Sequence, residues 1–91
     1  MDKDWIIAVC NSETDGILIY RFFGNNEEIK QKLCDLVKED REDHEGGWDY
    51  GCETIEDVIK IANGYEYQAY ATYADHHIDY TAKEFASIAH I

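Results

Sequence analysis

The chain has few basic residues, few cysteines and no long apolar run, and each shortage excludes a class of protein. Its 91 residues carry 20 acids against 8 bases, a formal net charge of −12. Phosphate backbones and anionic membranes repel such a chain, which disfavours direct binding to nucleic acid or to a membrane. Three cysteines without a Cys-x-x-Cys pair indicate neither a disulfide framework nor a zinc knuckle, and favour a reducing cytoplasm. The longest apolar runs, residues 5–10 and 17–20, are far shorter than the ~20 residues of a transmembrane helix.

What is present is the composition of a small globular protein. Hydrophobic residues make up 45% of the chain and aromatic residues 13%, enough for one modest core. Proline, low-complexity tracts and internal repeats are all missing from the sequence. We therefore expect a single domain over residues 1–91, as a monomer or weak dimer.

Apolar periodicity predicts a β-hairpin followed by a helix in the first half of the chain. Residues 5–10 and 17–23 are apolar segments separated by a turn cluster, which is typical of two antiparallel strands. The helix is indicated by apolar residues at i, i+4, i+7 and i+8, with Asn26 as its expected N-cap. These apolar positions are Ile29, Leu33, Leu36 and Val37. Asp40 and Asp43 continue the same side, so the helix should leave the core after about residue 39.

The second half of the chain predicts a second helix and one or two strands. Thr54 and Asp57 form a capping-box pattern before the apolar residues Ile55, Val58, Ile59 and Ala62. Alternation predicts a strand over residues 65–73, and the last segment fits either a strand or a capped helix. We therefore expect an α+β fold of two layers, an antiparallel sheet of three or four strands in the order ββααββ with two helices on one face. The predicted core is Ile7, Val9, Leu33, Leu36, Val37, Val58, Ile59, and Leu18 or Ile19.

Negative charge is concentrated in the middle of the chain. Residues 35–57 contain ten acids and two bases, which is −8 of the total of −12. In helical projection Glu28, Asp35, Glu39 and Glu42 lie within about 60° of one another and form an acidic stripe. Their axial spacings of roughly 4.5 to 10 Å are on the scale of phosphate spacing along nucleic acid. The stripe favours a basic partner, although a solvated helix face that only keeps the chain soluble has the same pattern.

An aromatic loop follows the predicted first helix and extends the candidate surface. Trp48 and Tyr50 stand among glycines and acids, and these two residue types dominate interface hot spots. The alternative is that Trp48 folds inward against the core. The candidate partner-binding set is Glu28, Asp35, Glu39, Glu42, Asp43, Glu45, Trp48, Asp49 and Tyr50.

Catalytic and cofactor chemistry has little support in the sequence. The chain has no phosphate-binding loop and no G-x-S-x-G motif, so we expect no enzyme activity and no cofactor. Cys10 falls in a predicted buried strand, and Cys52 is the one cysteine expected to be exposed. A metal hypothesis rests on Asp75, His77 and Asp79, which would share one face of a strand. A small-molecule or metal-binding regulatory domain using these residues is the alternative function.

Four segments between Asn26 and Tyr73 carry a family resemblance. They are the acidic helix start Glu27-Glu28-Ile29, the loop Trp48-Asp49-Tyr50-Gly51, the segment Thr54-Ile55-Glu56-Asp57-Val58, and Ala69-Tyr70 with Tyr73. This pattern resembles a segment of the ArdA-type antirestriction proteins, which are acidic DNA mimics, and the composition is similar to that of small acidic anti-CRISPR proteins. The resemblance implies a phage or mobile-element protein that inhibits a DNA-acting defence enzyme. We therefore expect a non-enzymatic cytoplasmic inhibitor whose acidic face mimics nucleic acid on a basic nuclease or other defence effector.

Overall fold

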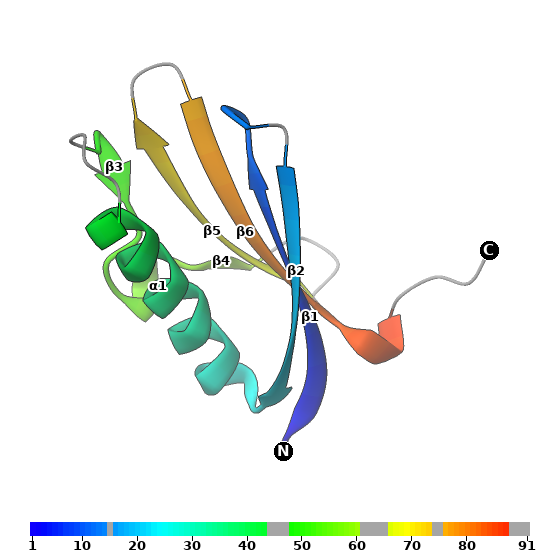
Figure 1. Cartoon of the computed structure of the whole chain (residues 1–91). Coiled ribbons are helices and arrows are strands. Elements are labelled where there is room, and N and C mark those ends of the chain that lie inside the picture. Colours follow the sequence, from blue (N-terminus) through cyan, green and yellow to red (C-terminus); the bar gives the residue numbers. More distant parts are fainter. Residues whose placement is uncertain (15, 44–47, 61–65, 74–75, 88–91) are drawn as a thin grey trace.

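An antiparallel sheet with one long helix across one face makes up the structure, a computed structural model that describes residues 1–14, 16–43, 48–60, 66–73 and 76–87 (Figure 1). The strand order is β2-β1-β6-β5-β3, and β4 also pairs with β5. Four strands are long, namely β1 (Lys3–Asn11), β2 (Gly16–Gly24), β5 (Glu66–Tyr73) and β6 (His76–Glu84). The strands β3 (Tyr50–Gly51) and β4 (Ile59–Lys60) have two residues each. The helix is α1 (Asn26–Asp43), and short 3₁₀ helices span Ile55–Asp57 and Phe85–Ser87.

The predicted order ββααββ, with two helices and three or four strands, is wrong. The described residues form a six-stranded sheet and a single α-helix. The Thr54 capping box does form, with the Thr54 N–H donating to Asp57 Oδ2 at 3.1 Å, but it begins only the 3₁₀ turn Ile55–Asp57. Val58 is extended, and Ile59 then pairs with Gln68 at the edge of β5. A helix this short depends on packing for its stability, and here the chain instead pairs its backbone with β5.

The core lies between α1 and the face of the sheet that it covers. Alternate residues of β1, β5 and β6 point to this face, and the largest buried side chains among them are Trp5 and Tyr80. The Trp5 Nε1–H donates to the Gly24 carbonyl oxygen at 3.0 Å, which ties β1 to the end of β2. The predicted core residues that are buried are Ile7, Val9, Leu33, Leu36 and Val37. Val58 is half-buried, whereas Ile59, Leu18 and Ile19 are exposed, so their placement in the core was wrong.

The start of α1 differs by one residue from the sequence-based expectation, and its last turn is exposed as expected. Asn25 rather than Asn26 is the N-cap, because Asn25 Oδ1 accepts the Glu28 N–H at 2.9 Å and Glu28 Oε1 accepts the Asn25 N–H at 3.0 Å. At the other end the helix continues to Asp43, although its buried residues stop at Val37. The Tyr80 hydroxyl donates to Asp40 Oδ2 at 2.6 Å, so a carboxylate is accommodated above the core. Within the described residues, no helix is both long and apolar enough to cross a membrane.

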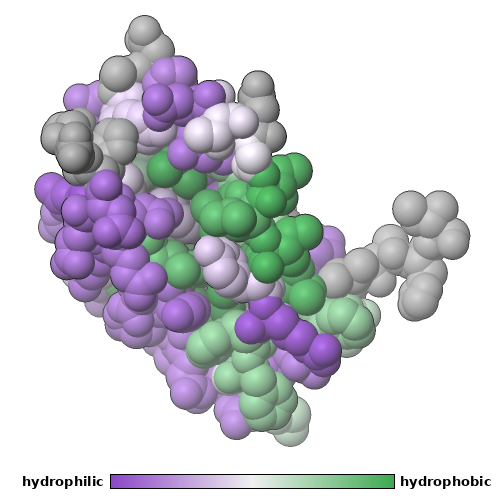
Figure 2. Space-filling model, in the orientation of Figure 1, coloured by the Kyte–Doolittle hydropathy of each residue, from purple (hydrophilic) through white to green (hydrophobic). Residues whose placement is uncertain are grey.

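The edge strand β2 leaves apolar side chains uncovered on both of its faces. The exposed fractions are 64% for Ile17, 59% for Leu18, 69% for Ile19, 42% for Tyr20 and 65% for Phe23. Figure 2 shows hydrophilic residues gathered over α1 and hydrophobic residues gathered over β2. The helix lies over the middle of the sheet and does not cover this strand (Figure 1).

Candidate functional site

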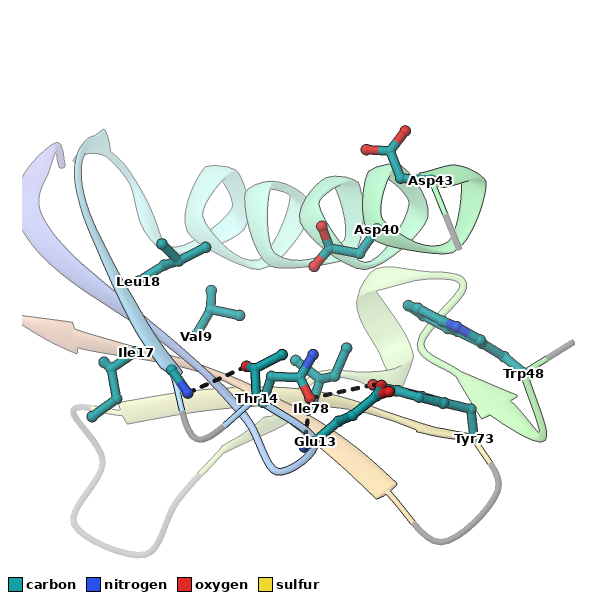
Figure 3. A pocket seen from close by; sticks show the side chains of 12 residues that line it. Val9, Glu13, Thr14, Ile17, Leu18, Asp40, Asp43, Trp48, Tyr73 and Ile78 are labelled. Atoms are coloured by element: carbon teal, nitrogen blue, oxygen red, sulfur yellow. Dashed lines mark hydrogen bonds between the residues drawn. The ribbon is translucent and has the colours of Figure 1, made fainter. Parts of the chain in front are cut away.

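A groove of about 450 Å³ lies between the C-terminal end of α1 and the turn that joins β1 to β2. Its apolar part is formed by Val9, Leu18 and Ile78, which project from three adjacent strands below the helix (Figure 3). Asp40 and Asp43 border it from α1, and Glu13 borders it from the turn. An apolar hollow with a carboxylate border fits a side chain or segment that is apolar in part and cationic in part.

Trp48 and Tyr73 close one end of this groove. Their rings are stacked, with centroids 6.1 Å apart and planes inclined by 15°. The Tyr73 hydroxyl lies 2.6 Å from Glu13 Oε2 and 3.2 Å from Asn11 Oδ1, so β5 is linked to the β1–β2 turn. Donation to the Glu13 carboxylate, together with burial, raises the pKa of Tyr73. Trp48 is therefore a half-buried wall of the groove, as the inward alternative had it, and not a freely exposed anchor.

Tyr50 and Asp49 remain on the surface beside this wall. The Tyr50 side chain is 39% exposed and rests on the ring of Tyr70, with centroids 4.9 Å apart. The next residue is Gly51, and a β-carbon at this position would come within 3.1 Å of the Trp48 ring. The close approach fixes Tyr50 and Trp48 on opposite sides of a tight backbone segment. Tyr50 is thus the aromatic residue of the predicted loop that a partner can reach.

The predicted acidic stripe divides into carboxylates that have local partners and carboxylates that are exposed at the C-terminal end of α1. Glu28 belongs to the capping box, and Asp35 Oδ1 accepts a hydrogen bond from Gln31 Nε2 at 2.9 Å. Glu39, Glu42 and Asp43 are exposed in the last turns of α1. Glu45 lies outside the described residues. Asp43 therefore borders the groove, with Glu39 and Glu42 exposed on the same last turns of α1. Tyr50 lies against Tyr70 on the other face of the sheet, and Glu28 lies at the far end of the helix.

The position of these acids opposes the helix dipole. The C-terminal end of a helix carries partial negative charge, so each carboxylate in the last turn costs about 0.3–1 kcal/mol at low salt. The basic residue in that turn is Arg41, and it pairs with Glu53 at 3.4 Å rather than with the neighbouring acids. The end of α1 is therefore a region of concentrated negative potential.

The burial of the cysteine side chains differs from the prediction. Cys10 is exposed and Cys52 is buried, the reverse of the sequence-based expectation, because Cys10 points to the sheet face opposite α1 while Cys52 faces the helix. The Cys34 and Cys52 Sγ atoms lie 3.5 Å apart as free thiols. Burial raises the pKa of both thiols, that of Cys52 to about 12. Neither thiol is suited to act as a nucleophile at neutral pH.

The metal hypothesis gains no ligand set from the described residues. His77 Nε2 lies 3.4 Å from Asp79 Oδ2 on the uncovered sheet face, whereas Asp75 lies outside the described residues. Within residues 1–14, 16–43, 48–60, 66–73 and 76–87, no three His, Cys, Asp or Glu side chains form a group that could hold a metal.

The apolar part of the groove and the Glu13–Tyr73 contact were not predicted from the sequence. Alternation predicted the strand that carries Tyr73, but only the pairing of β1 with β6 and of β6 with β5 brings the turn at Glu13 next to it. Comparison of the chain with protein-family models, curated proteins and solved structures found no match.

Proposed function

We propose that this protein is a non-enzymatic inhibitor that binds a basic, nucleic-acid-handling enzyme through the acidic end of α1 and the groove beside it. The observation that carries the proposal is the position of exposed Glu39 and Glu42, with Asp43 at the border of an apolar groove. Lys and Arg side chains line nucleic-acid sites, and carboxylates on a rigid helix can take the place of phosphates there. The groove then accepts an apolar side chain of the same partner.

The cost of this arrangement favours a function over mere solubility. Acids that keep a chain soluble work equally well anywhere on its surface, but here they gather at the helix end where the dipole opposes them. Like charges three or four residues apart on one helix repel each other by a few tenths of a kcal/mol. Glu39, Glu42 and Asp43 combine both penalties. A partner with complementary charge would offset this destabilisation on binding.

The proposed setting is anti-defence in a reducing cytoplasm. The resemblance to ArdA-type antirestriction proteins supports a phage or mobile-element protein that blocks a restriction or CRISPR nuclease. Three free cysteines are consistent with a compartment that keeps thiols reduced. A net charge of −12 repels nucleic acid, so the nuclease itself, and not its DNA or guide RNA, is the proposed partner.

The test is inhibition of purified restriction and CRISPR nucleases in a DNA-cleavage assay. We expect the wild-type chain to inhibit at least one of them, and an excess of the substrate DNA to relieve the inhibition by competition. Simultaneous Glu39→Lys, Glu42→Lys and Asp43→Lys substitution should weaken inhibition by at least a hundredfold. Inhibition should also weaken steeply with ionic strength, because exposed charge pairs are screened beyond a Debye length of about 8–10 Å.

The matched control reverses three exposed acids elsewhere. Asp2, Glu27 and Glu56 are exposed and lie outside the last turn of α1, and their replacement by Lys changes the net charge equally. This control should lose far less inhibition. Equal loss in the two triple variants would mean that overall charge, not this site, governs binding. Full inhibition by the Glu39, Glu42 and Asp43 variant would overturn the proposal.

A further inference from the structure

The outer edge of β2 offers an unused row of backbone hydrogen-bonding groups. The Ser12 N–H donates to the His77 carbonyl oxygen at 3.0 Å, and this hydrogen bond continues the register in which β1 pairs with β6. Along an antiparallel strand, the backbone N–H and C=O groups of successive residues point alternately to the two neighbouring strands. Those of the even-numbered residues of β1 therefore point to β6, and those of the odd-numbered residues point to β2. The β1–β2 register then turns the even-numbered residues of β2 toward β1. The odd-numbered residues direct their N–H and C=O groups outward, and these are Ile17, Ile19, Arg21 and Phe23.

Protein edges of this kind are usually protected, and this one is not. Common protections are a short strand, a proline, a bulge or several charges. Here the strand has nine residues, it pairs with β1 without interruption, and the chain contains no proline. Its one charged residue, Arg21, lies 3.3 Å from Asp4 and over the Phe85 ring. Among the described residues nothing pairs with this edge, and its apolar side chains are exposed on both faces.

We propose that β2 pairs antiparallel with β2 of a second copy of this chain, about a two-fold axis at Tyr20, and so joins two sheets into one. This register pairs Ile17 with Phe23 of the partner and Ile19 with Arg21 of the partner. All four outward-facing residues of each copy then exchange both of their backbone hydrogen bonds. Tyr20 meets its own counterpart, and Leu18 meets Phe22 of the partner, in cross-strand pairs on the helix side.

The charge distribution selects a second copy rather than a charged partner. None of the 20 acids lies between Gly16 and Gly24, and Asp4 compensates the charge of Arg21. A basic protein therefore gains nothing electrostatically at this edge, while a neutral apolar strand matches it on both faces. A two-fold interface requires such self-complementarity. The axis is perpendicular to the sheet, so the two copies of α1 lie on the same side and the acidic ends stay free.

Sedimentation equilibrium and a cysteine cross-link test the proposal together. We expect the wild-type chain to sediment at twice its mass of 10.6 kDa and to dissociate on dilution. Ile19→Lys places a second cation beside Arg21 of the partner and should weaken the dimer at least tenfold. In a Cys10→Ser background, Tyr20→Cys should form an interchain disulfide on mild oxidation, since opposed residues of a non-hydrogen-bonded pair lie about 4.5 Å apart.

The matched controls use Ile59 at the opposite edge of the sheet. Ile59 is 49% exposed on β4, so Ile59→Lys makes the same chemical change without touching β2 and should leave the dimer intact. Ile59→Cys in the same background should not cross-link. Circular dichroism checks that each variant is folded, and the Tyr20→Cys result stands even if Ile19→Lys does not fold.

Two results would overturn the dimer. One is a wild-type chain that stays monomeric at every accessible concentration. The other is cross-linking that is no faster for Tyr20→Cys than for Ile59→Cys. The inhibitor variants at Glu39, Glu42 and Asp43 should dimerise normally, and Ile19→Lys should still inhibit a nuclease at sufficient concentration. Failure of the dimer is therefore separable from failure of the proposed function.

Discussion

Tyr80 connects the core to the acidic helix through one hydroxyl group. Its ring is fully buried, and its hydroxyl donates to Asp40, forty residues away in sequence, at 2.6 Å. Burial and the neighbouring carboxylate both raise the pKa of Tyr80, so the hydroxyl keeps its proton as donor at all ordinary pH values. This contact holds the last turns of α1 on the sheet and so fixes the direction in which the exposed acids point.

Tyr80→Phe should therefore destabilise the protein by about 1.5–3 kcal/mol. The substitution keeps the packed ring but leaves the half-buried Asp40 carboxylate without its donor, and hydrogen bonds to charged groups are worth about this much. Urea unfolding at neutral pH measures the loss. Tyr70→Phe is the control, because the Tyr70 ring lies against Tyr50 on the other side of the sheet. This variant should lose less than about 0.5 kcal/mol of stability. Equal losses in both variants would contradict the role given to Asp40.

The raised pKa of Cys52 predicts that the protein loses stability in alkaline solution. Its pKa is about 12 in the folded chain, because burial and the adjacent Cys34 sulfur disfavour the thiolate, against an ordinary value of 9.0. Above pH 9 the unfolded chain releases this proton and the folded chain does not. The contribution is thus fully present below pH 9 and falls as pH rises toward 12.

At pH 10 this effect amounts to about 1 kcal/mol. Urea unfolding at pH 7 and pH 10 measures it. The Cys52→Ala variant, although less stable at both pH values, should lose less between them than the wild type. Cys10→Ala serves as the comparison, because Cys10 is exposed. An identical alkaline loss in the Cys52→Ala variant and the wild type would exclude this thiol as the cause.

At the scale of elements, local patterns predicted β1, β2 and α1 but not what each element meets. Apolar spacing alone placed Leu33, Leu36 and Val37 in the core. It could not place Asp40, since its partner Tyr80 is brought near only by the sheet. The prediction of a second helix was wrong for a similar reason. Ile59 pairs with the edge of β5, and the local sequence does not show that this edge is available.

The candidate site was predicted in the same partial way. Charge counts identified Glu39, Glu42 and Asp43, because acid density is visible in composition. The groove was not predicted, because Val9, Leu18 and Ile78 come from three strands that only the sheet order makes adjacent. The exposure of β2 also depends on where α1 crosses the sheet, which the apolar pattern of residues 17–23 does not encode.

The end of α1 should become more stable when its acids are neutralised. Glu42→Gln with Asp43→Asn removes two carboxylates from the negative end of the helix dipole, which should raise the free energy of unfolding by about 0.5–2 kcal/mol in total at low salt. The same change at the first turn, Glu27→Gln, should lower it, because Glu27 favours that end and pairs with Lys30 at 3.4 Å. Urea unfolding at two ionic strengths measures both effects. Together with weaker nuclease inhibition, a gain in stability would show that the acids are kept for binding. If neutralisation gave no gain in stability, the acids would carry no energetic cost, and this support for the proposed function would be lost.

At the scale of the whole molecule, charge and apolar surface are separated. The acids gather on and beside α1, while the edge strand β2 is almost neutral and apolar (Figure 2). Two copies joined at β2 therefore bring together the least charged part of a chain of net charge −12. The same separation would leave both acidic helix ends available on one side of the joined sheet, so the proposed dimer would present two copies of the proposed binding surface.

This separation predicts opposite salt dependence for the two interactions. Two chains of net charge −12 repel each other, and added salt screens this repulsion while leaving the apolar and backbone contacts of β2 intact. The dimer should therefore tighten severalfold between about 0.05 and 0.5 M sodium chloride. Binding to a basic nuclease joins opposite charges, so it should weaken over the same range. Sedimentation and inhibition assays in one buffer series measure both. If dimerisation weakened with salt as inhibition does, the self-association would involve charged surfaces such as α1 and not the neutral edge of β2.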